Sequence, residues 1–310
     1  MVKSKKLSYL IPVAIFFAIA VALFAVGCAK DLDISKGLYD RYQLNIPVFS
    51  TIFCLIGPLV TGAFGAFSGT ALFMTSNRKS KVMTVLLKIG SVLFILLTSY
   101  FAYSTSIEFI DSIHTTNERL KAGLDYGTFS IVILLDVLIG FFTYKFVKKQ
   151  DEKKVFWTVL TMAVIICFVA LFGEIFKYLA SRPRPRLIFT NAQYSFKEWY
   201  QWNPLYGFKE HECKSFISGH SNNACSVITL LPLWLSLTKF GQKKHFVPLA
   251  IAVGGIYWLV IMVSRVLAIA HFMTDVAAAG IVSIILQVSA LFVMEKIKNK
   301  TGDVIAPASN

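Results

Sequence analysis

The sequence is short of charged residues. Only 15% of its 310 residues are Asp, Glu, Lys or Arg, whereas a soluble protein typically carries about 25%. Hydrophobic residues make up 56%, the mean hydropathy is +0.64, and apolar stretches recur along the chain. Many of these stretches are about 20 residues long, which is the length that crosses a bilayer as a helix. These features exclude a soluble globular protein and predict an all-α, polytopic transmembrane helical bundle.

Cysteine is scarce as well. The five cysteines have neither the spacing of metal ligands nor that of a disulfide framework. Cys28 ends the stretch "AVGC", which faintly resembles a lipoprotein cleavage site. The apolar stretch before it is long for a signal peptide, so a retained first span is the preferred interpretation and lipoprotein processing the alternative.

Eight apolar segments are candidate spans, and together they predict a bundle of about eight transmembrane helices. They cover residues 7–28, 49–73, 83–108, 127–146, 155–180, 217–237, 247–264 and 271–294. Asp136 is an isolated carboxylate deep in the fourth of them, and packing against a polar neighbour is as good an explanation for it as a functional role.

Acidic residues are outnumbered, 17 against 31 Lys and Arg, which gives a net charge of +14. Of the 31 cations, 17 lie in the N-terminus, the C-terminal tail and three connections, 74–82, 145–154 and 238–246. The loops 29–48 and 109–126, which alternate with them, hold five. Because Lys and Arg concentrate in cytoplasmic loops, both termini are predicted in the cytoplasm, and the excess charge needs no nucleic-acid partner.

A second group of cations lies on the opposite, outer side and runs against this bias, so it requires another explanation. It comprises Lys177, Arg182, Arg184, Arg186, Lys197, Lys209, Lys214 and Arg265. The outer loop 181–216 also carries many aromatic residues. An aromatic belt at the membrane interface explains most of them, and contact of one or two with a lipid headgroup is the alternative.

Three short segments bring polar chemistry to this outer side. In the first, "KYLASRPRP", Lys177 ends a span and Arg184 follows seven residues later, directly before Pro185. Proline fixes the backbone there and stops the helix. A lysine and an arginine held in this way suit phosphate oxygens, of which a guanidinium can bind two. Snorkelling of both cations to lipid headgroups is the alternative.

The second segment is "SGH" at the start of the sixth predicted span. Unpaired N–H groups at a helix N-terminus favour an anion, and Gly219 allows close approach of the backbone. Ser218 adds a hydroxyl, and His220 stands where it can give or take a proton. A serine cap followed by an interfacial histidine is the structural alternative.

The third segment, "SRVLAIAHFMTD", carries Arg265, His271 and Asp275. The aspartate follows the histidine by four residues, which places both on one helical face. A carboxylate in that position can hold the imidazole in one tautomer and leave the other nitrogen free to attack.

The three segments in this order, Lys-x6-Arg-Pro, Ser-Gly-His and Ser-Arg-x5-His-x3-Asp, resemble the signature of the type 2 phosphatidic acid phosphatase family. The resemblance covers about residues 150–297 and implies a six-helix-type phosphatase core in the C-terminal half, within 151–297. Residues 1–150 would then be N-terminal transmembrane helices that elaborate the core, and 298–310 a cytoplasmic tail. One position departs from the family, because Ile217 stands where proline usually precedes Ser-Gly-His.

The resemblance also implies roles. His271 would be the nucleophile that forms a phosphohistidine, Asp275 would orient it, and His220 would protonate the leaving oxygen and then activate water. The implied phosphate ligands are Lys177, Arg184, Ser218, Gly219 and Arg265. The family requires no metal, and no cofactor is implied.

The expected function is therefore metal-independent hydrolysis of a lipid phosphate or diphosphate at the extracytoplasmic face of the cell membrane. Phosphatidic acid, phosphatidylglycerol phosphate and undecaprenyl diphosphate are the substrate types that the family accommodates. Two alternatives remain: transfer of the phosphoryl group to another hydroxyl, and an anion or lipid transporter that uses the same cations.

Overall fold

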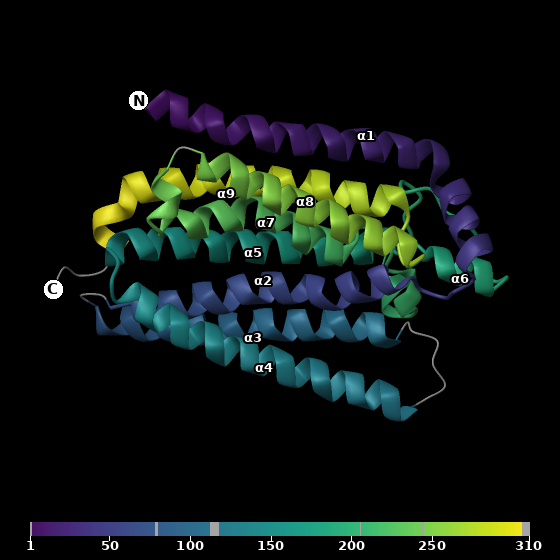
Figure 1. Cartoon of the computed structure of the whole chain (residues 1–310), viewed down its shortest axis with the longest axis horizontal. Helices are drawn as coiled ribbons and strands as arrows, with labels where there is room; N and C mark the ends of the chain where they lie inside the picture. Colours follow the sequence, from purple (N-terminus) through teal and green to yellow (C-terminus); the bar gives the residue numbers. More distant parts are fainter. Residues whose placement is uncertain (1, 78–79, 112–117, 205, 244, 306–310) are drawn as a thin grey trace.

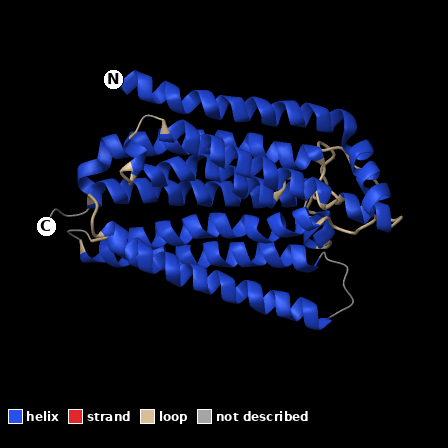
Figure 2. Cartoon of the chain, in the orientation of Figure 1, coloured by secondary structure: helices blue, strands red, loops and turns tan. Residues whose placement is uncertain are grey.

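The computed structural model describes residues 2–77, 80–111, 118–204, 206–243 and 245–305, and all regular secondary structure in these ranges is helical (Figure 2). The α-helices are α1 (Val2–Tyr42), α2 (Val48–Met74), α3 (Lys81–Asp111), α4 (Glu118–Val147), α5 (Glu152–Ala180), α6 (Pro185–Thr190), α7 (Gly219–Ser236), α8 (Phe246–Leu267) and α9 (Met273–Ile305). Three short 3-10 helices are η1 (Tyr206–Phe208), η2 (His211–Cys213) and η3 (Phe240–Gln242). The predicted all-α class is confirmed.

Seven helices of the described chain, α1 to α5, α8 and α9, are long and apolar enough to cross a membrane. The remaining long helix, α7, corresponds to the predicted span 217–237 and begins with the polar run "GHSNN". It packs against α2, α5, α8 and α9. Because its neighbours shield it, buried polar residues such as Asn222 and Ser226 face protein rather than lipid, where polar groups find partners.

Six helices form the central bundle. Helices α5, α7, α8 and α9 come from the C-terminal half, and α1 and α2 join them from the N-terminal half. Helix α1 lies along α8 and α9, while α2 contacts α5, α7 and α8 (Figure 1). Helices α3 and α4 cover the outside of α2 (Figure 1). Two helices from the N-terminal half thus pack directly against the helices in which the phosphatase core is predicted.

Helix α1 is longer than predicted. We expected a loop over residues 29–48, but the helix continues to Tyr42. Ion pairs one turn apart, Lys30–Asp33 at 2.9 Å and Lys36–Asp40 at 2.6 Å, lie on its exposed side, and such spacing supports a helix. Because hydropathy detects only the apolar part of a helix, it placed the end of this one too early.

Two other boundaries also differ. Helix α4 begins at Glu118 rather than near 127, and α9 continues to Ile305, through most of the segment 298–310 predicted as a tail. Residues 306–310 of that tail and 112–117 of the predicted loop 109–126 lie outside the described residues.

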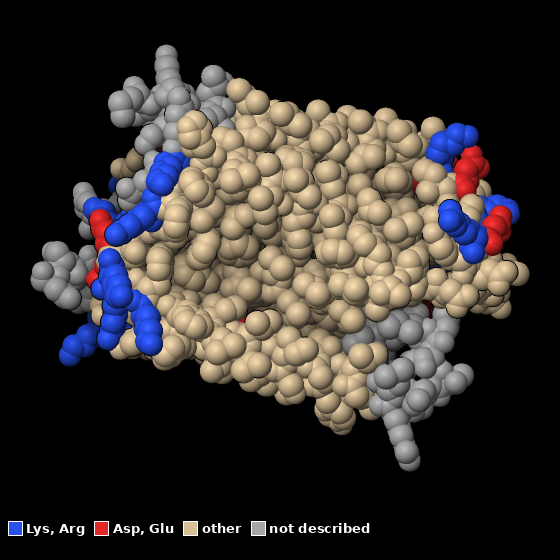
Figure 3. Space-filling view, in the orientation of Figure 1, with Lys and Arg blue, Asp and Glu red and all other residues tan. Residues whose placement is uncertain are grey.

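Charge separates along the bundle axis. In Figure 3 a broad, almost uncharged band covers the middle of the molecule, and most of the coloured charges gather at its two ends. The beginning of α1 and the end of α9 lie at one end, and α6 lies at the other (Figure 1). An apolar band between two charged ends is the pattern of a membrane-spanning bundle.

Asp136 has a structural partner. Its Oδ2 accepts a hydrogen bond of 2.6 Å from the hydroxyl of Ser99, which joins α4 to α3. This contact agrees with the structural explanation of this carboxylate and lies far along the chain from the three motifs.

Close contact between α7 and α8 depends on Gly254. A Cβ atom there would lie 2.8 Å from the backbone nitrogen of Ile228 and 2.8 Å from the carbonyl oxygen of Val227. Such backbone atoms cannot move aside as the end of a flexible side chain can.

We therefore predict that Gly254→Ala lowers the thermal midpoint of the detergent-solubilised protein, by the equivalent of about 1–3 kcal/mol. The matched control is Gly90→Ala in α3, where nothing lies within 4 Å of the new Cβ. This control should leave the midpoint unchanged or raise it, because alanine is the better helix former. Equal midpoints for both variants would contradict the prediction.

Candidate functional site

The structure places all eight predicted site residues at the end of the bundle that carries α6. Lys177 lies in the last turn of α5, and Arg184 is the N-cap of α6. Ser218 is the N-cap of α7, and Gly219 and His220 are its first two residues. Arg265 lies in the last turn of α8, and His271 and Asp275 flank the start of α9. Segments 88 residues apart, from Lys177 to Arg265, therefore meet at one place.

The start of α7 is built for close approach. Ser218 is the N-cap, and its hydroxyl accepts the backbone N–H of Ser221 at 3.5 Å. An added Cβ on Gly219 would lie 2.8 Å from the Nζ of Lys177. A glycine at this position lets the lysine lie directly against the first turn of the helix, where N–H groups point outward. Ile217, the residue before this cap, is fully buried and packs with Phe216.

The ring of His271 is fixed by a backbone carbonyl. Its Nδ1 lies 2.8 Å from the carbonyl oxygen of Ser215, and the residue is only 2% exposed. A carbonyl can only accept, so Nδ1 carries the proton and donates it. In the neutral imidazole the lone pair is then on Nε2. His271 is thereby held in the tautomer that a nucleophile acting through Nε2 requires.

Asp275 supports this loop without bonding to the ring. Its Oδ2 is 3.9 Å from Nδ1 of His271, beyond hydrogen-bond range. The same oxygen accepts the Ser215 hydroxyl at 2.5 Å and the Phe272 N–H at 2.9 Å. The prediction from spacing placed a carboxylate in direct contact with the imidazole. In the structure the direct partner is the Ser215 carbonyl, and Asp275 holds the segments on both sides of it.

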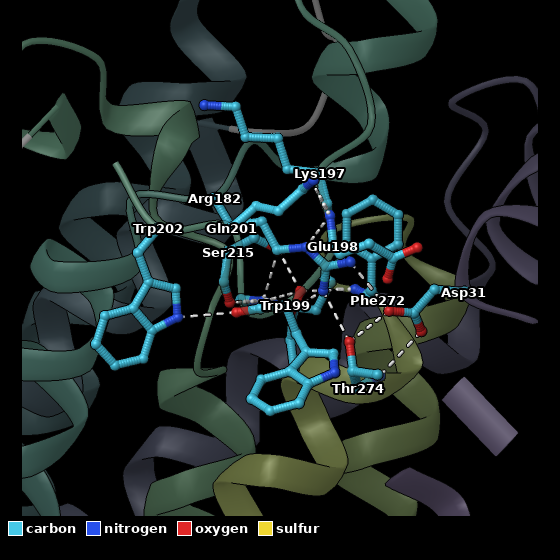
Figure 4. Close-up of polar contacts among 12 residues, drawn as sticks. Asp31, Arg182, Lys197, Glu198, Trp199, Gln201, Trp202, Ser215, Phe272 and Thr274 are labelled. Carbon is cyan, nitrogen blue, oxygen red and sulfur yellow. Dashed lines mark hydrogen bonds and ion pairs between the residues drawn. The ribbon is translucent and has the colours of Figure 1, made fainter. Parts of the chain in front are cut away.

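Arg182 links Asp275 to the N-terminal half of the chain. Its Nη1 donates to Asp275 Oδ1 at 2.7 Å, and its Nη2 to Asp31 Oδ2 at 3.1 Å. The guanidinium lies 4.0 Å from the ring centroid of Phe272 and is 1% exposed. Thr274 completes the group, since its N–H and its hydroxyl both donate to Asp31 (Figure 4). A buried cation thus has a carboxylate on either side, as buried charges require.

Sequence reasoning missed Asp31 and assigned no role to Arg182. Asp31 sits in "KDLD", which reads as a polar helix end among other charged residues. Its neighbour Asp33 is exposed and forms only a surface pair, while Asp31 is 4% exposed. The one available signal was the inclusion of Arg182 among cations that run against the positive-inside bias.

Whereas the ring of His271 is fixed through Nδ1, the ring of His220 is fixed through Nε2. Its Nε2 lies 3.2 Å from the carbonyl oxygen of Cys54 in α2. Because the carbonyl accepts, Nε2 carries the proton, and Nδ1 is the nitrogen left for exchange. The Sγ of Cys54 in turn accepts the Arg265 Nη1–H at 3.2 Å. One residue of α2 therefore contacts two of the predicted site residues.

Three cations lie near the two histidines, Arg184 and Arg265 near both rings and Lys177 near His220. Arg265, Lys177 and Arg184 all lie close enough to interact electrostatically with the ring of His220. Burial lowers the pKa of His271 well below the ordinary value of 6.5, and the charges of Arg265 and Arg184 and the nearby His220 lower this pKa further. His271 is therefore neutral at pH 7. Two buried cations, Arg184 and Arg265, together with the partly buried Lys177, provide strong attraction for a phosphate group.

The loop over this end is itself clamped. Arg186 forms two bonds of 2.7 Å with the carboxylate of Glu212, and the backbone N–H of Arg184 donates to the Glu212 carbonyl at 3.0 Å. A bidentate pair of this kind fixes geometry as well as charge. It holds the α5–α6 segment, which carries Arg184, against the segment that leads to α7.

An apolar cavity of about 590 Å³ lies elsewhere, between α2, α4 and α7. Phe64, Phe67, Phe142, Leu231 and Trp234 contribute to its lining, which is almost entirely apolar. It contains none of the predicted site residues and is unsuited to an anion. Among the side chains that the structure describes, no group of three or more His, Cys, Asp or Glu is placed to hold a metal ion.

The Asp31–Arg182 pair provides a test of this geometry. We predict that Asp31→Asn destabilises the protein by about 2 kcal/mol, because it removes the charge from a buried hydrogen-bonded pair. The measurement is thermal unfolding in detergent. The control is Asp33→Asn, two residues away on the exposed side of α1, which should change the midpoint little. Equal losses in both variants would show that Asp31 is not a buried partner of Arg182.

Comparison with known proteins gives one match. Residues 158–298 match the family model described as the PAP2 superfamily. Searches of curated proteins and of solved structures found no match. The matched segment contains α7 and α8, most of α5 and α9, and all eight predicted site residues. Members of this superfamily are phosphatases, which supports a phosphatase-type activity on phosphate esters. Over residues 158–298 the chain is thus similar to the PAP2 superfamily, which is consistent with a member of the type 2 phosphatidic acid phosphatase family.

Proposed function

We propose that the protein is a membrane lipid phosphatase that hydrolyses a lipid phosphate or diphosphate through a phosphohistidine. The observation that carries the proposal is the pair of histidines fixed through opposite ring nitrogens. His271 is held at Nδ1 by the Ser215 carbonyl, and His220 at Nε2 by the Cys54 carbonyl. One ring thus presents Nε2 and the other Nδ1, beside three cations.

In the first step, Nε2 of His271 attacks the phosphorus, and the bond from phosphorus to the lipid oxygen breaks. The leaving oxygen takes a proton from Nδ1 of His220, whose protonated form is stabilised within this cluster of cations by the negative charge of the bound phosphate. The Ser215 carbonyl, which accepts the Nδ1–H bond, stabilises the positive charge that develops on His271. The buried carboxylate of Asp275, 3.9 Å away, stabilises the same charge.

In the second step, water attacks the phosphorus and the bond to Nε2 breaks. Nδ1 of His220, now neutral, takes the proton from water, and inorganic phosphate leaves. His220 returns to its protonated form and His271 to its neutral form. A histidine that alternates between acid and base in this way is a general feature of two-step group transfer.

The cations have a separate role. Lys177, Arg184 and Arg265 bind the phosphate oxygens and neutralise the charge that develops on them, which is the main demand of phosphoryl transfer. The Ser218 hydroxyl and the Gly219 N–H at the start of α7 add neutral donors. The placement of Lys177 against Gly219 supports their action on the same anion.

We place the site at the extracytoplasmic face and both termini in the cytoplasm. The distribution of Lys and Arg supports this orientation, since the site lies at the end of the bundle opposite the start of α1 (Figure 1). Tyr200, Trp202 and Phe208 are exposed near the site and suit the membrane interface. Phosphatidic acid, phosphatidylglycerol phosphate and undecaprenyl diphosphate are the proposed substrate types.

The principal test measures phosphate release from these three lipids, in detergent with a chelator present. His271→Ala should lower the rate about a thousandfold or more, because the covalent nucleophile is lost. The control is His245→Ala, an exposed histidine between η3 and α8, which should leave the rate unchanged. Unchanged release by His271→Ala would overturn the proposal. Appearance of label on an added lipid or sugar hydroxyl would identify a phosphotransferase, and flux in proteoliposomes without both histidines would identify a transporter.

The pH dependence provides a second test. Since the pKa of His271 is lowered, its neutral form persists as the pH falls, and the acid limb of kcat/KM due to this group should lie below pH 6.5. Arg265→Gln removes a cation that lowers this pKa, so the limb should move to higher pH, whereas Arg265→Lys keeps the charge and should move it less. Titration of the substrate affects the pH profiles of both variants equally, so it does not contribute to the difference between them. Coincident limbs for the two variants would contradict the electrostatic argument.

A further inference from the structure

Helix α2 contains a proline at the one position that opens the carbonyl of Cys54. In an α-helix the carbonyl of residue i accepts the N–H of residue i+4. Residue 58 is proline, which has no N–H to donate. The Cys54 carbonyl therefore lacks its usual partner within the helix, and it needs another because Cys54 is fully buried in the protein.

The ring of His220 supplies the missing hydrogen-bond donor. Its Nε2 lies 3.2 Å from the Cys54 oxygen, and the two residues are 4% and 0% exposed. The contact joins residues 166 positions apart in the sequence. A buried imidazole N–H and a buried carbonyl each satisfy the other here, where either would be costly alone.

The same stretch of α2 is held in register against the site helices. The Tyr257 hydroxyl of α8 donates to the Gly57 carbonyl at 2.6 Å, and the Thr61 hydroxyl donates to the Asn223 carbonyl of α7 at 3.2 Å. These two bonds lie one residue before and three residues after Pro58. They fix the position of the Cys54 carbonyl, along the axis of α2, relative to His220.

We propose that Pro58 is a positioning residue for the reaction: it opens the Cys54 carbonyl, which holds His220 with Nδ1 available for proton exchange. This inference rests on the proposed function. Pro58 contacts no substrate in this scheme. Its effect passes through one hydrogen bond to the ring that moves the proton in both steps, so it concerns the chemical step rather than binding of the lipid.

The test is Pro58→Ala, which returns an N–H to position 58 and lets it compete for the carbonyl. Without its fixed partner the His220 ring can turn or change tautomer. We expect kcat to fall about tenfold, a fraction of the full contribution of a general acid–base group, while KM changes little. The matched control is Pro232→Ala, also a buried proline within a helix and in the same helix as His220. It should leave kcat unchanged.

A double variant distinguishes positioning from a general structural effect. In a His220→Gln background, Pro58→Ala should cause no further loss of kcat, because the residue through which it acts is already gone. A full additional tenfold loss in that background would overturn the inference.

A second measurement covers the case in which Pro58→Ala misfolds. Position 58 is replaced by the α-hydroxy acid analogue of alanine, which has the alanine side chain but an ester oxygen in place of the N–H. This protein should retain nearly the wild-type kcat, since the carbonyl stays open. A tenfold loss of kcat here would overturn the inference by showing that the proline ring matters rather than the missing N–H.

Failure of the two proposals can be told apart. If His220→Gln lowers phosphate release and Pro58→Ala does not, the positioning role of Pro58 is wrong and the proposed function stands. If neither His220→Gln nor His271→Ala lowers it, the proposed function itself fails.

Discussion

The buried guanidinium of Arg182 is the interaction on which the arrangement of this end of the bundle depends. It follows α5 directly, and its partners come from α1 through Asp31, from α9 through Asp275, and from the outer loop through the carbonyl of Lys197 at 2.8 Å. A buried ion pair gives little net stability over an apolar core, but loss of one partner leaves an uncompensated charge. The three elements are therefore held to one geometry, and the Ser215–Asp275 bond extends that geometry to His271.

The four N-terminal helices do not all relate to the site in the same way. Helix α1 contributes Asp31 and helix α2 contributes Cys54, and both reach residues of the predicted site. In the outer layer, Asp136 of α4 bonds to Ser99 of α3. We therefore treat α1 and α2 as part of the site's framework, and α3 and α4 as the elaboration that the sequence led us to expect for the whole half.

The sequence was informative where chemistry has a local signature. Hydropathy located the apolar helices, and three spaced motifs located the residues that meet at one end of the bundle. The sequence did not reveal the partners that are backbone atoms, the carbonyls of Ser215 and Cys54, because every residue has a carbonyl and only the fold determines which one a side chain contacts. It also missed Asp31, since the burial of that carboxylate depends on Arg182 and Thr274, which lie 151 and 243 residues away.

Those separations have a consequence for how the protein is made. Chains emerge from the ribosome at about 5–20 residues per second, so Thr274 is synthesised roughly 10–50 seconds after Asp31. Throughout that interval the carboxylate of Asp31 has neither of its native donors from α9. Gly27 brings α1 within close range of the Thr274 backbone, so this contact between α1 and α9 forms only after Thr274 has been made. The hydrogen bonds that join Asp31 to α9 are thus among the late contacts of α1, and the charge network around Arg182 is complete only once α9 has been made.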